Sequence, residues 1–550
     1  MKVKNEIQQK ESLFQNMKLF KLNRSNYSHK SEMNRIKPLE KFRNIQLINQ
    51  YSKFSEDLQD IVDERTWNDL ELDSIFSYID RTLTKTGEQY LYRLLQKEQS
   101  ISQNELMKRI ISHYSKDSDQ LSKSAQILEK YERNSTYGLP SFFIAGNFKS
   151  VASWIKLLSL TFICLMVGSF FLAPLLLPLI ISFLINTYVH YYLKTRVNTY
   201  HYEFKNIKAL YDCYLKLHKV ENQDTYLSAK EINSLRTISK KCFYLSLNIE
   251  YADEFSAFIY YLIEIIKAAV LYDGLQFNKT IKLLKEHTHV IQKTFDYIGI
   301  SDTAQSLYYL KKHTNGTEPT VSTNRFIQVQ NARHPLIQNC IPNSLRIEDQ
   351  NIIITGGNMS GKTTFLKTIG INVILSQTIN YAFCEYIEIP KQLKISTSIT
   401  SADSLLHSKS YFMDELERAK TIISAVHKDE TVRLILMDEL FRGTNSIDRI
   451  SISVAFLLFL NEYDCKVVVT THDLDTIHLL HGEYDTYYFD NTFRNNRLHF
   501  NYQLQKGIQY KTNVIDLLKS FHYPMEIIQK AELFRKKLTD GQGDSMEELI

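Results

Sequence analysis

The chain has 550 residues, of which 44% are hydrophobic and 23% are charged, and its formal net charge is +5. This composition excludes a largely disordered chain, and the length predicts several domains. The small positive charge permits a polyanionic partner but does not require one. The six cysteines form no CxxC pair, and none lies at zinc-ligand spacing from a histidine. We therefore expect reduced thiols in a cytosolic compartment.

Residues 1–60 are polar and basic. Within them, residues 1–50 hold eleven Lys/Arg and four Glu, a local charge of +7 (11 − 4). Such a segment is typical of a solvated, poorly ordered arm, although it could also contact nucleic acid or anionic lipid. It lacks the apolar region of a cleavable signal peptide, so we expect none.

Residues 61–150 and 194–320 are expected to form a helical region. The segments Glu254–Tyr272 and Lys279–Tyr297 repeat apolar residues at intervals of three and four, which predicts long amphipathic helices. The pair Lys240-Lys241 could contact a DNA backbone, but such a pair is usually a solvated helix face.

Residues 151–193 are strongly apolar, and no Asp, Glu, Lys or Arg lies between Lys156 and Lys194. A transmembrane helix needs about 20 apolar residues, so this run of about 37 predicts two short spans, Ile155–Leu172 and Leu175–Leu193, with a turn at Pro174. Lysines and arginines flank both ends, which places both ends on the cytoplasmic side of a membrane. The alternative is a helical hairpin buried in a soluble, cytoplasmic protein.

Residues 321–550 alternate strands with helices, which predicts an α/β domain with a parallel sheet. A linker-like stretch, His313–Thr323, precedes it. The expected strands are Phe326–Gln330, Asn351–Thr355, Arg433–Met437 and Cys465–Thr470.

The segment GGNMSGKTT follows the second of these strands and precedes an apolar helix, which is the context of a phosphate-binding P-loop. Lys362 is expected to reach the β- and γ-phosphates of ATP, and the hydroxyl of Thr363 to bind Mg²⁺. Glycines let the backbone amides point at the phosphates. The expected cofactor-binding residues of the loop are Gly356, Gly357, Asn358, Met359, Ser360, Gly361, Lys362, Thr363 and Thr364.

Two further strands end in reactive side chains. Asp438 follows Leu434–Met437 and is expected to hold Mg²⁺, while Glu439 would orient or deprotonate the attacking water. His472 follows the strand at Val467–Thr470 and could reach the γ-phosphate. The predicted catalytic residues are thus Glu439, Lys362 and His472.

Taken together, these motifs resemble the MutS branch of the ABC-type ATPases. The P-loop GGNMSGKTT, the stretch LMDELFRGTNSID at 436–448 and Thr470-Thr471-His472 each resemble a motif of that family. So do NARHPL at 331–336 and SYFMDE at 410–415, the signature segment. Tyr381–Glu385 resembles a further stretch, but Glu385 replaces its glutamine, so no Q-loop residue is assigned. Upstream, TWNDLEL at 66–72 and IDRTLTKTG at 79–87 resemble the start of the family's helical core.

The resemblance implies an ATPase that binds and hydrolyses Mg-ATP as a homodimer with composite sites. Each P-loop would then be completed by the signature segment of the other subunit, represented here by Ser410. It also implies a DNA-associated, mismatch-repair-related role. However, only about 60 residues precede the core, too few for the family's mismatch-reading domain, and the apolar run is a second departure. The alternative function is a membrane-anchored mechanochemical ATPase that acts on a protein or membrane partner.

Overall fold

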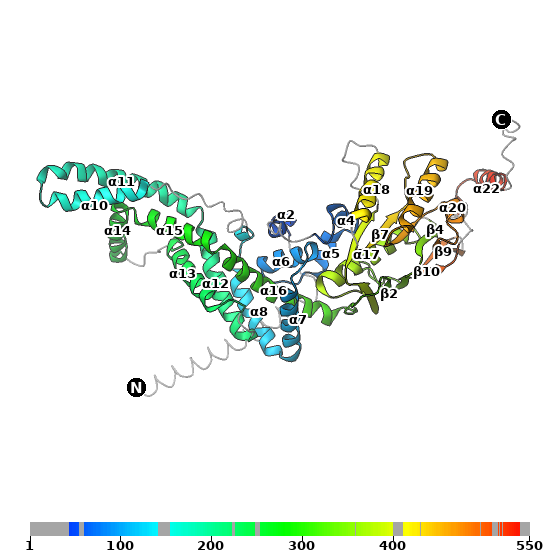
Figure 1. Cartoon of the computed structure of the whole chain (residues 1–550), viewed down its shortest axis with the longest axis horizontal. Helices are drawn as coiled ribbons and strands as arrows, with labels where there is room; N and C mark the ends of the chain where they lie inside the picture. Colours follow the sequence, from blue (N-terminus) through cyan, green and yellow to red (C-terminus); the bar gives the residue numbers. More distant parts are fainter. Residues whose placement is uncertain are drawn as a thin grey trace. The chain divides into compact units, whose positions relative to one another are not determined.

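The computed structural model describes residues 43–53, 60–140, 154–222, 226–247, 254–357, 359–399, 411–428, 431–494, 497–508, 515, 518–519 and 521–539. The chain divides into two compact units, one of Met1–Gln59 with Ile79–His313 and one of Asp60–Tyr78 with Thr314–Ile550. The first is helical and the second contains the sheets (Figure 1). Most of the predicted basic arm lies outside the described residues.

The helical unit contains helices of very different length. Its elements are α2 (Ile45–Ile48), α3 (Gln50–Lys53), α6 (Lys85–Gln96), α7 (Ile101–Lys116), α8 (Ser118–Glu132), α10 (Trp154–Ser169), η1 (Ala173–Leu175), α11 (Leu176–Asn198), α12 (His201–Glu221), α13 (Ala229–Leu245), α14 (Glu254–Ala269), α15 (Tyr272–Glu286) and α16 (Thr288–His313). The helix predicted over Lys279–Tyr297 is wrong in one respect, because the chain breaks at His287, the C-cap of α15.

Helices α6 and α16 approach each other closely at two glycines. A Cβ at Gly87 would lie 2.2 Å from Oδ2 of Asp302, and one at Gly299 would lie 2.5 Å from Cβ of Tyr90. The buried Asp302 carboxylate accepts hydrogen bonds from the backbone amides of Leu83 (2.9 Å) and Thr84 (2.8 Å). The motif at residues 79–87 therefore has a structural explanation, since it folds around this carboxylate.

The apolar run forms two helices, α10 and α11, which pack side by side and are joined through η1 at Pro174, where the turn was predicted (Figure 1). Among the described residues, Ala173–Asn198 alone is long and apolar enough to cross a membrane, judged by length and composition. Trp154–Ser169 is apolar but shorter, so the prediction of two full spans stays a prediction. Only 22% of the apolar window in Ala173–Asn198 is buried, unlike a helix in the core of a soluble protein.

The second unit contains a six-stranded sheet in the order β10-β9-β4-β8-β7-β6 and a four-stranded sheet in the order β1-β5-β2-β3. The strands of the larger sheet are β4 (Asn351–Gly356), β6 (Leu393–Ser398), β7 (Val432–Asp438), β8 (Cys465–Thr470), β9 (Tyr484–Arg494) and β10 (Arg497–Lys506). All its neighbouring pairs are parallel except β9 with β10. The smaller sheet contains β1 (Thr320–Ser322), β2 (Ile327–Ala332), β3 (Asn343–Ile347) and β5 (Tyr386–Pro390). The predicted α/β architecture with a parallel sheet is confirmed.

Side-chain alternation in the central strands gives the larger sheet two apolar faces. One face, with Ile353, Ile435 and Val467, packs against α18 (Tyr411–Lys428), α19 (Ser446–Asn461) and α20 (Leu474–Leu479). The other face packs against α17 (Lys362–Ile379), where a Cβ at Gly370 would lie 2.9 Å from Cδ1 of Leu436. A further helix of this unit, α22, covers Met525–Thr539.

Residues 60–78 pack with this α/β unit, although the sequence assigned them to the helical region. They form α4 (Glu64–Asp69) and most of α5 (Leu72–Ile79). Asp69 accepts hydrogen bonds from the Thr397 hydroxyl (2.6 Å) and the Ile399 amide (2.9 Å), at the end of β6. Asp63 pairs with Arg418 of α18 (2.8 Å). These pairings join residues more than 300 positions apart, which local sequence patterns do not reveal.

Substitution of Gly87 by alanine is expected to destabilise the helical unit by roughly 1–3 kcal/mol, because the added Cβ displaces the Asp302 carboxylate from its buried partners. Thermal and urea unfolding measure the effect. Gly138→Ala is the matched control, because a Cβ there would meet only Oε1 of Glu203 at an ordinary 3.6 Å. Equal stabilities of the two variants would contradict this account of the motif.

Candidate active site

The connection between β4 and α17 is a tight loop that depends on glycine. Gly356 and Gly361 have φ angles of 144° and 101°, a region that L side chains rarely adopt. A Cβ at Gly356 would also lie 2.8 Å from the carbonyl oxygen of Phe489. No side chain caps the start of α17, so its first amides are available to an anion.

The other loop residues differ in how they face the site. Ser360 is buried, and its Oγ has no hydrogen-bond partner within the described part of the chain. A buried hydroxyl without a partner is costly, and phosphate oxygens would satisfy it. Met359 is 86% exposed and takes a φ of 65°. Asn358 lies outside the described residues.

Lys362 is the first residue of α17, and its ammonium group lies under the loop. Nζ donates hydrogen bonds to the carbonyl oxygens of Gly356 (2.9 Å) and Gly357 (3.1 Å). Burial lowers the pKa of Lys362, while the nearby carboxylates of Glu439 and Asp438 oppose this effect. A buried cation whose hydrogen bonds go to neutral carbonyl groups is a strong partner for an incoming phosphate.

Asp438 joins the loop to two neighbouring strands. Its Oδ2 accepts a hydrogen bond from the Thr363 hydroxyl (2.7 Å), and its Oδ1 accepts one from the Thr470 hydroxyl. Asp438 and Thr470 stand opposite each other in the register of β7 and β8. The parallel sheet thus brings these oxygens together at the carboxyl ends of its strands, the usual ligand-binding edge of such sheets.

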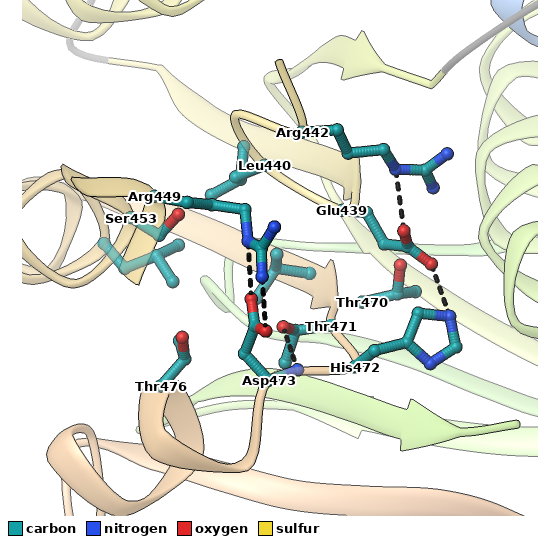
Figure 2. Close-up of a pocket in the computed structure, with 12 residues that line it drawn as sticks. Glu439, Leu440, Arg442, Arg449, Ser453, Thr470, Thr471, His472, Asp473 and Thr476 are labelled. Carbon is teal, nitrogen blue, oxygen red and sulfur yellow. Dashed lines mark hydrogen bonds and ion pairs between the residues drawn. The ribbon is translucent and has the colours of Figure 1, made fainter. Parts of the chain in front are cut away.

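Glu439 lies between a histidine and an arginine (Figure 2). Its Oε1 is 2.6 Å from Nε2 of His472, and its Oε2 is 2.7 Å from Nε of Arg442. Burial raises the pKa of Glu439, but the His472 hydrogen bond and the charges of His472, Arg442 and Lys362 outweigh it and lower the pKa overall. The backbone has a positive φ of 48° at Glu439, a strained conformation of the kind found at functional sites.

The proton on His472 can be assigned from these contacts. Nε2 of His472 lies 2.6 Å from the Glu439 carboxylate and 3.3 Å from Nζ of Lys362. An ionised carboxylate only accepts hydrogen bonds, so Nε2 carries the proton and donates it to Glu439. Nε2 therefore has no lone pair for Lys362, whose partners remain the two loop carbonyls.

A cleft of ≈ 910 Å³ opens above the loop. Its polar lining comes from the P-loop, Asp438, Glu439 and Arg442, and its apolar lining includes Ile337, Ile341 and Tyr502. Thr364 also lines it. A second, smaller cavity of ≈ 170 Å³ shares Glu439 and Arg442 with the cleft and is bounded by Thr470–Asp473 (Figure 2).

The residues present fit a triphosphate with a divalent cation. The unpartnered Ser360 hydroxyl, the uncapped start of α17 and the buried Lys362 ammonium favour an anion in the cleft. The Thr363 and Asp438 oxygens are hard donors of the kind that Mg²⁺ prefers.

The signature segment is described only in part. Ser410 lies outside the described residues, and α18 begins at Tyr411. Gly443 packs against the start of this helix, because a Cβ there would lie 2.6 Å from Cβ of Phe412.

Sequence reasoning missed several residues that line or hold the site. Arg442 pairs with Glu439 and lies 3.6 Å from Oδ2 of Asp438, and the Thr470 hydroxyl holds that same Asp438. A signal for Thr470 was available: β7 and β8 both end in polar residues, and if the two strands are neighbours in a parallel sheet, Thr470 lies beside Asp438. The apolar wall residues had no such signal, because they come from a loop after β2 and from β10.

The NARHPL segment at 331–336 has a structural role in this unit. The Arg333 amide donates to the Phe383 carbonyl oxygen (2.9 Å), and Nδ1 of His334 accepts from the Leu336 amide (3.3 Å). Burial lowers the pKa of His334, which favours the neutral ring. The loop that follows contributes Ile337 and Ile341 to the cleft.

Comparison with known proteins places these features in a family. Residues 352–539 match the family model of MutS domain V. The chain is 27% identical over 286 residues to the DNA mismatch repair protein MutS of Staphylococcus haemolyticus, covering 48% of this chain and 31% of that protein. It is 28% identical over 272 residues to the protein of the same name from Staphylococcus saprophyticus, covering 46% and 29%. The match thus spans about a third of the length of these curated relatives.

Alanine at Gly356 is expected to abolish Mg-ATP binding, because its Cβ would force the loop away from the Phe489 carbonyl. Gly482→Ala is the matched control: Gly482 also has a positive φ, 92°, but a Cβ there meets nothing within 4 Å. Both positions have a positive φ that L residues rarely adopt, at a cost of about 1–3 kcal/mol, so loss of binding in Gly356→Ala alone would be attributed to the close approach. Binding of a fluorescent ATP analogue measures it, and undiminished binding by Gly356→Ala would contradict the role given to the loop.

Proposed function

The C-terminal part of this chain belongs to the MutS family, and from that premise we propose that the protein is an ATPase that binds and hydrolyses Mg-ATP in the cleft above Lys362. The observation that carries this proposal is the convergence of Lys362, Thr363, Asp438 and Glu439 at one edge of the sheet. A buried cation, two hard oxygen donors and a carboxylate beside them are the groups that phosphoryl transfer to water requires.

Each side chain has a distinct task in the proposed reaction. Lys362 exchanges two neutral carbonyl partners for phosphate oxygens and stabilises their charge. Thr363 and Asp438 would hold Mg²⁺, which would supply positive charge to offset that of the phosphates. The base of the nucleotide would lie toward Ile337, Ile341 and Tyr502, whose apolar faces suit a purine ring.

Glu439 is the proposed base that orients or deprotonates the attacking water. In this structure both of its carboxylate oxygens are engaged, one by His472 and one by Arg442. Each oxygen keeps a second lone pair for a water molecule, but the contacts with His472 and Arg442 lower the pKa of Glu439 and so weaken it as a base. We propose that His472 turns toward the γ-phosphate when ATP binds, which would free Oε1 and make catalysis depend on nucleotide.

We further propose that two chains form a homodimer with composite sites. In such a dimer the signature segment at the start of α18 would face the phosphates held by the partner subunit. Two contacts support a mechanical role for this helix: Arg418 of α18 pairs with Asp63, and Lys367 of α17 pairs with Glu71 (2.6 Å). The segment of residues 60–78 therefore contacts both the P-loop helix and the signature helix. Through this segment, movement of one helix would displace the other.

Two substitutions separate binding from hydrolysis. Lys362→Ala should lose detectable Mg-ATP binding, because the phosphates lose their buried cation. Glu439→Gln should retain binding but slow hydrolysis by about 10²–10⁴-fold and accumulate an ATP-bound dimer. Lys391→Ala, which changes an exposed lysine of the connection between β5 and β6, is the control and should leave both properties unchanged. Normal hydrolysis by Glu439→Gln would remove Glu439 from its assigned role.

For the partner, the leading proposal is DNA, in a mismatch-repair-related role. Its support is the family and the printed names of the relatives, each a DNA mismatch repair protein MutS. Of the candidate pair Lys240-Lys241, Lys240 is exposed, whereas Lys241 lies 3.5 Å from Oε1 of Gln276. Lys240 is therefore the residue of this pair that could contact a phosphate.

A membrane-anchored mechanochemical ATPase is the second candidate, and the apolar surface of α10 and α11 favours it. Phe170 and Phe171 at the turn between them are 84% and 83% exposed, and Leu160 and Leu184 are more than half exposed. Water disfavours so much exposed apolar surface, whereas lipid favours it. In this proposal residues 155–193 anchor the protein as a multi-pass membrane protein and the α/β unit lies on the cytoplasmic side.

ATPase activity of the detergent-purified full chain distinguishes the partners. Duplex, branched and mismatched DNA are each added at low salt, and lipid vesicles are added in parallel. A DNA-associated enzyme should be stimulated by DNA, with a response that falls as salt increases because counterions are released on binding. Activity that responds to lipid and never to DNA would contradict the DNA proposal and favour the mechanochemical one.

A further inference from the structure

Helix α14 exposes apolar side chains and buries a charged one. Between Phe255 and Ile266 its exposed side chains are almost all apolar or aromatic, whereas Glu264 is buried. The exposed members are Phe255, Phe258, Ile259, Tyr261, Leu262, Ile263, Ile265 and Ile266. A helix on the surface of a soluble protein does the reverse, because burial of apolar area in water is favourable by about 25 cal/mol per Å². The amphipathic pattern of this segment was thus recognised from the sequence, but its polar face points inward.

On the buried face of α14, carboxylates and cationic side chains form a cluster in which opposite charges pair. Glu264 accepts hydrogen bonds from Lys194 (2.9 Å) and Tyr260 (2.8 Å) and lies 3.2 Å from Nε2 of His190. Lys267 lies 3.8 Å from both Glu264 and Asp273. His190, Glu264 and Asp273 resemble a metal-ligand set, but the two lysines already neutralise its carboxylates. The cluster is better explained as a set of ion pairs that keeps charge away from the outer surface.

Helix α11 shows the same inversion. Ser182, Asn186 and His190, spaced four residues apart, are buried, and the Asn186 side chain donates to the Ala269 carbonyl oxygen (2.6 Å) at the end of α14. The outward side chains are apolar or aromatic, with Leu177, Ile181, Leu184, Ile185, Tyr188, Tyr191 and Tyr192 exposed. Helices α11 and α14 pack against each other (Figure 1), and both expose apolar side chains.

We propose that α14 is a third membrane-contacting element, which lies along the bilayer surface beside the α10–α11 anchor and buries its outward face among the lipid chains near the headgroups. This inference rests on the proposed membrane anchorage. The 16 residues of α14 reach about 24 Å, less than the ~30 Å hydrocarbon core, so α14 does not span the bilayer. Aromatic residues such as Phe255, Tyr261 and Tyr188 suit the interfacial zone, where one end of a ring meets water and the rest meets lipid.

Lipid fits this surface better than a protein partner does. Protein interfaces form about one hydrogen bond per 100–200 Å² and surround an apolar centre with a polar rim. Among the exposed side chains described between Phe255 and Ile266, Tyr261 alone carries a polar group. The ionisable groups Glu264 and Lys267 are instead used inside the protein, as expected where the outer medium cannot solvate them.

The test uses the full chain in vesicles of phosphatidylcholine and phosphatidylglycerol. Cys164 and Cys340, the two cysteines that are not buried, are first replaced by serine. A single cysteine at Leu262, Leu184 or Ser115 then carries an environment-sensitive fluorophore. Ser115 is an exposed residue of α7 and serves as the aqueous control. Quenchers attached to the lipid near the headgroup or deep in the acyl chain report the depth of each label.

The label at Leu262 is expected to be quenched most by the shallow quencher, the label at Leu184 also by the deep one, and the label at Ser115 by neither. Quenching at Leu184 without quenching at Leu262 would overturn the role of α14 while the anchor stands. Absence of quenching at both sites would overturn the anchor as well. Protection of Leu262 together with cross-links between two copies through that position would assign the surface to a protein interface and overturn the proposal.

Discussion

The site depends on one electrostatic arrangement, an ammonium group buried beneath a glycine loop and facing two carboxylates at the ends of neighbouring strands. Lys362 can remain there because the loop carbonyls solvate it, and the loop can curl over it because Gly356 has no side chain. Asp438 holds the loop helix to the sheet through the Thr363 and Thr470 hydroxyls. A triphosphate with its cation would replace these internal contacts by stronger ones. Binding would therefore require Lys362 and Asp438 to change their partners.

The packing of the α/β unit provides contacts through which such a rearrangement would be transmitted. The buried Asp69 ends a short helix, α4, and the exposed Asp63 caps its start. Asp69 binds the end of β6, and Asp63 binds the helix that carries the signature segment. Burial raises the pKa of Asp69, whereas Asp63, despite the opposing effect of burial, has its pKa lowered by Arg418 and by the Thr66 amide. Residues 60–78 thus connect the nucleotide loop helix, the signature helix and the sheet, and the chain continues from them into the helical unit.

Much of the site could be predicted because its determinants are local. The strand, glycine loop and helix around Lys362 are contiguous, and each of the acids and His472 directly follows an apolar strand. The docking of Asp69 onto Thr397 could not be predicted, since 328 residues separate them. Periodicity gave α14 an apolar face but could not say whether that face meets protein or lipid, because both are apolar. The break at His287 has no proline or glycine beside it, so the sequence gives no strong breaker to predict it.

Thr363 and Asp438 are proposed to hold a metal ion on a bound triphosphate. Electron–nuclear double resonance of Mn²⁺, used in place of Mg²⁺ with a slowly hydrolysed ATP analogue, tests it directly. The account predicts phosphorus couplings from the nucleotide in the wild-type protein, and their loss in Thr363→Val and Asp438→Asn. Couplings that persist unchanged in both variants, or that never appear in the wild-type protein, would contradict it.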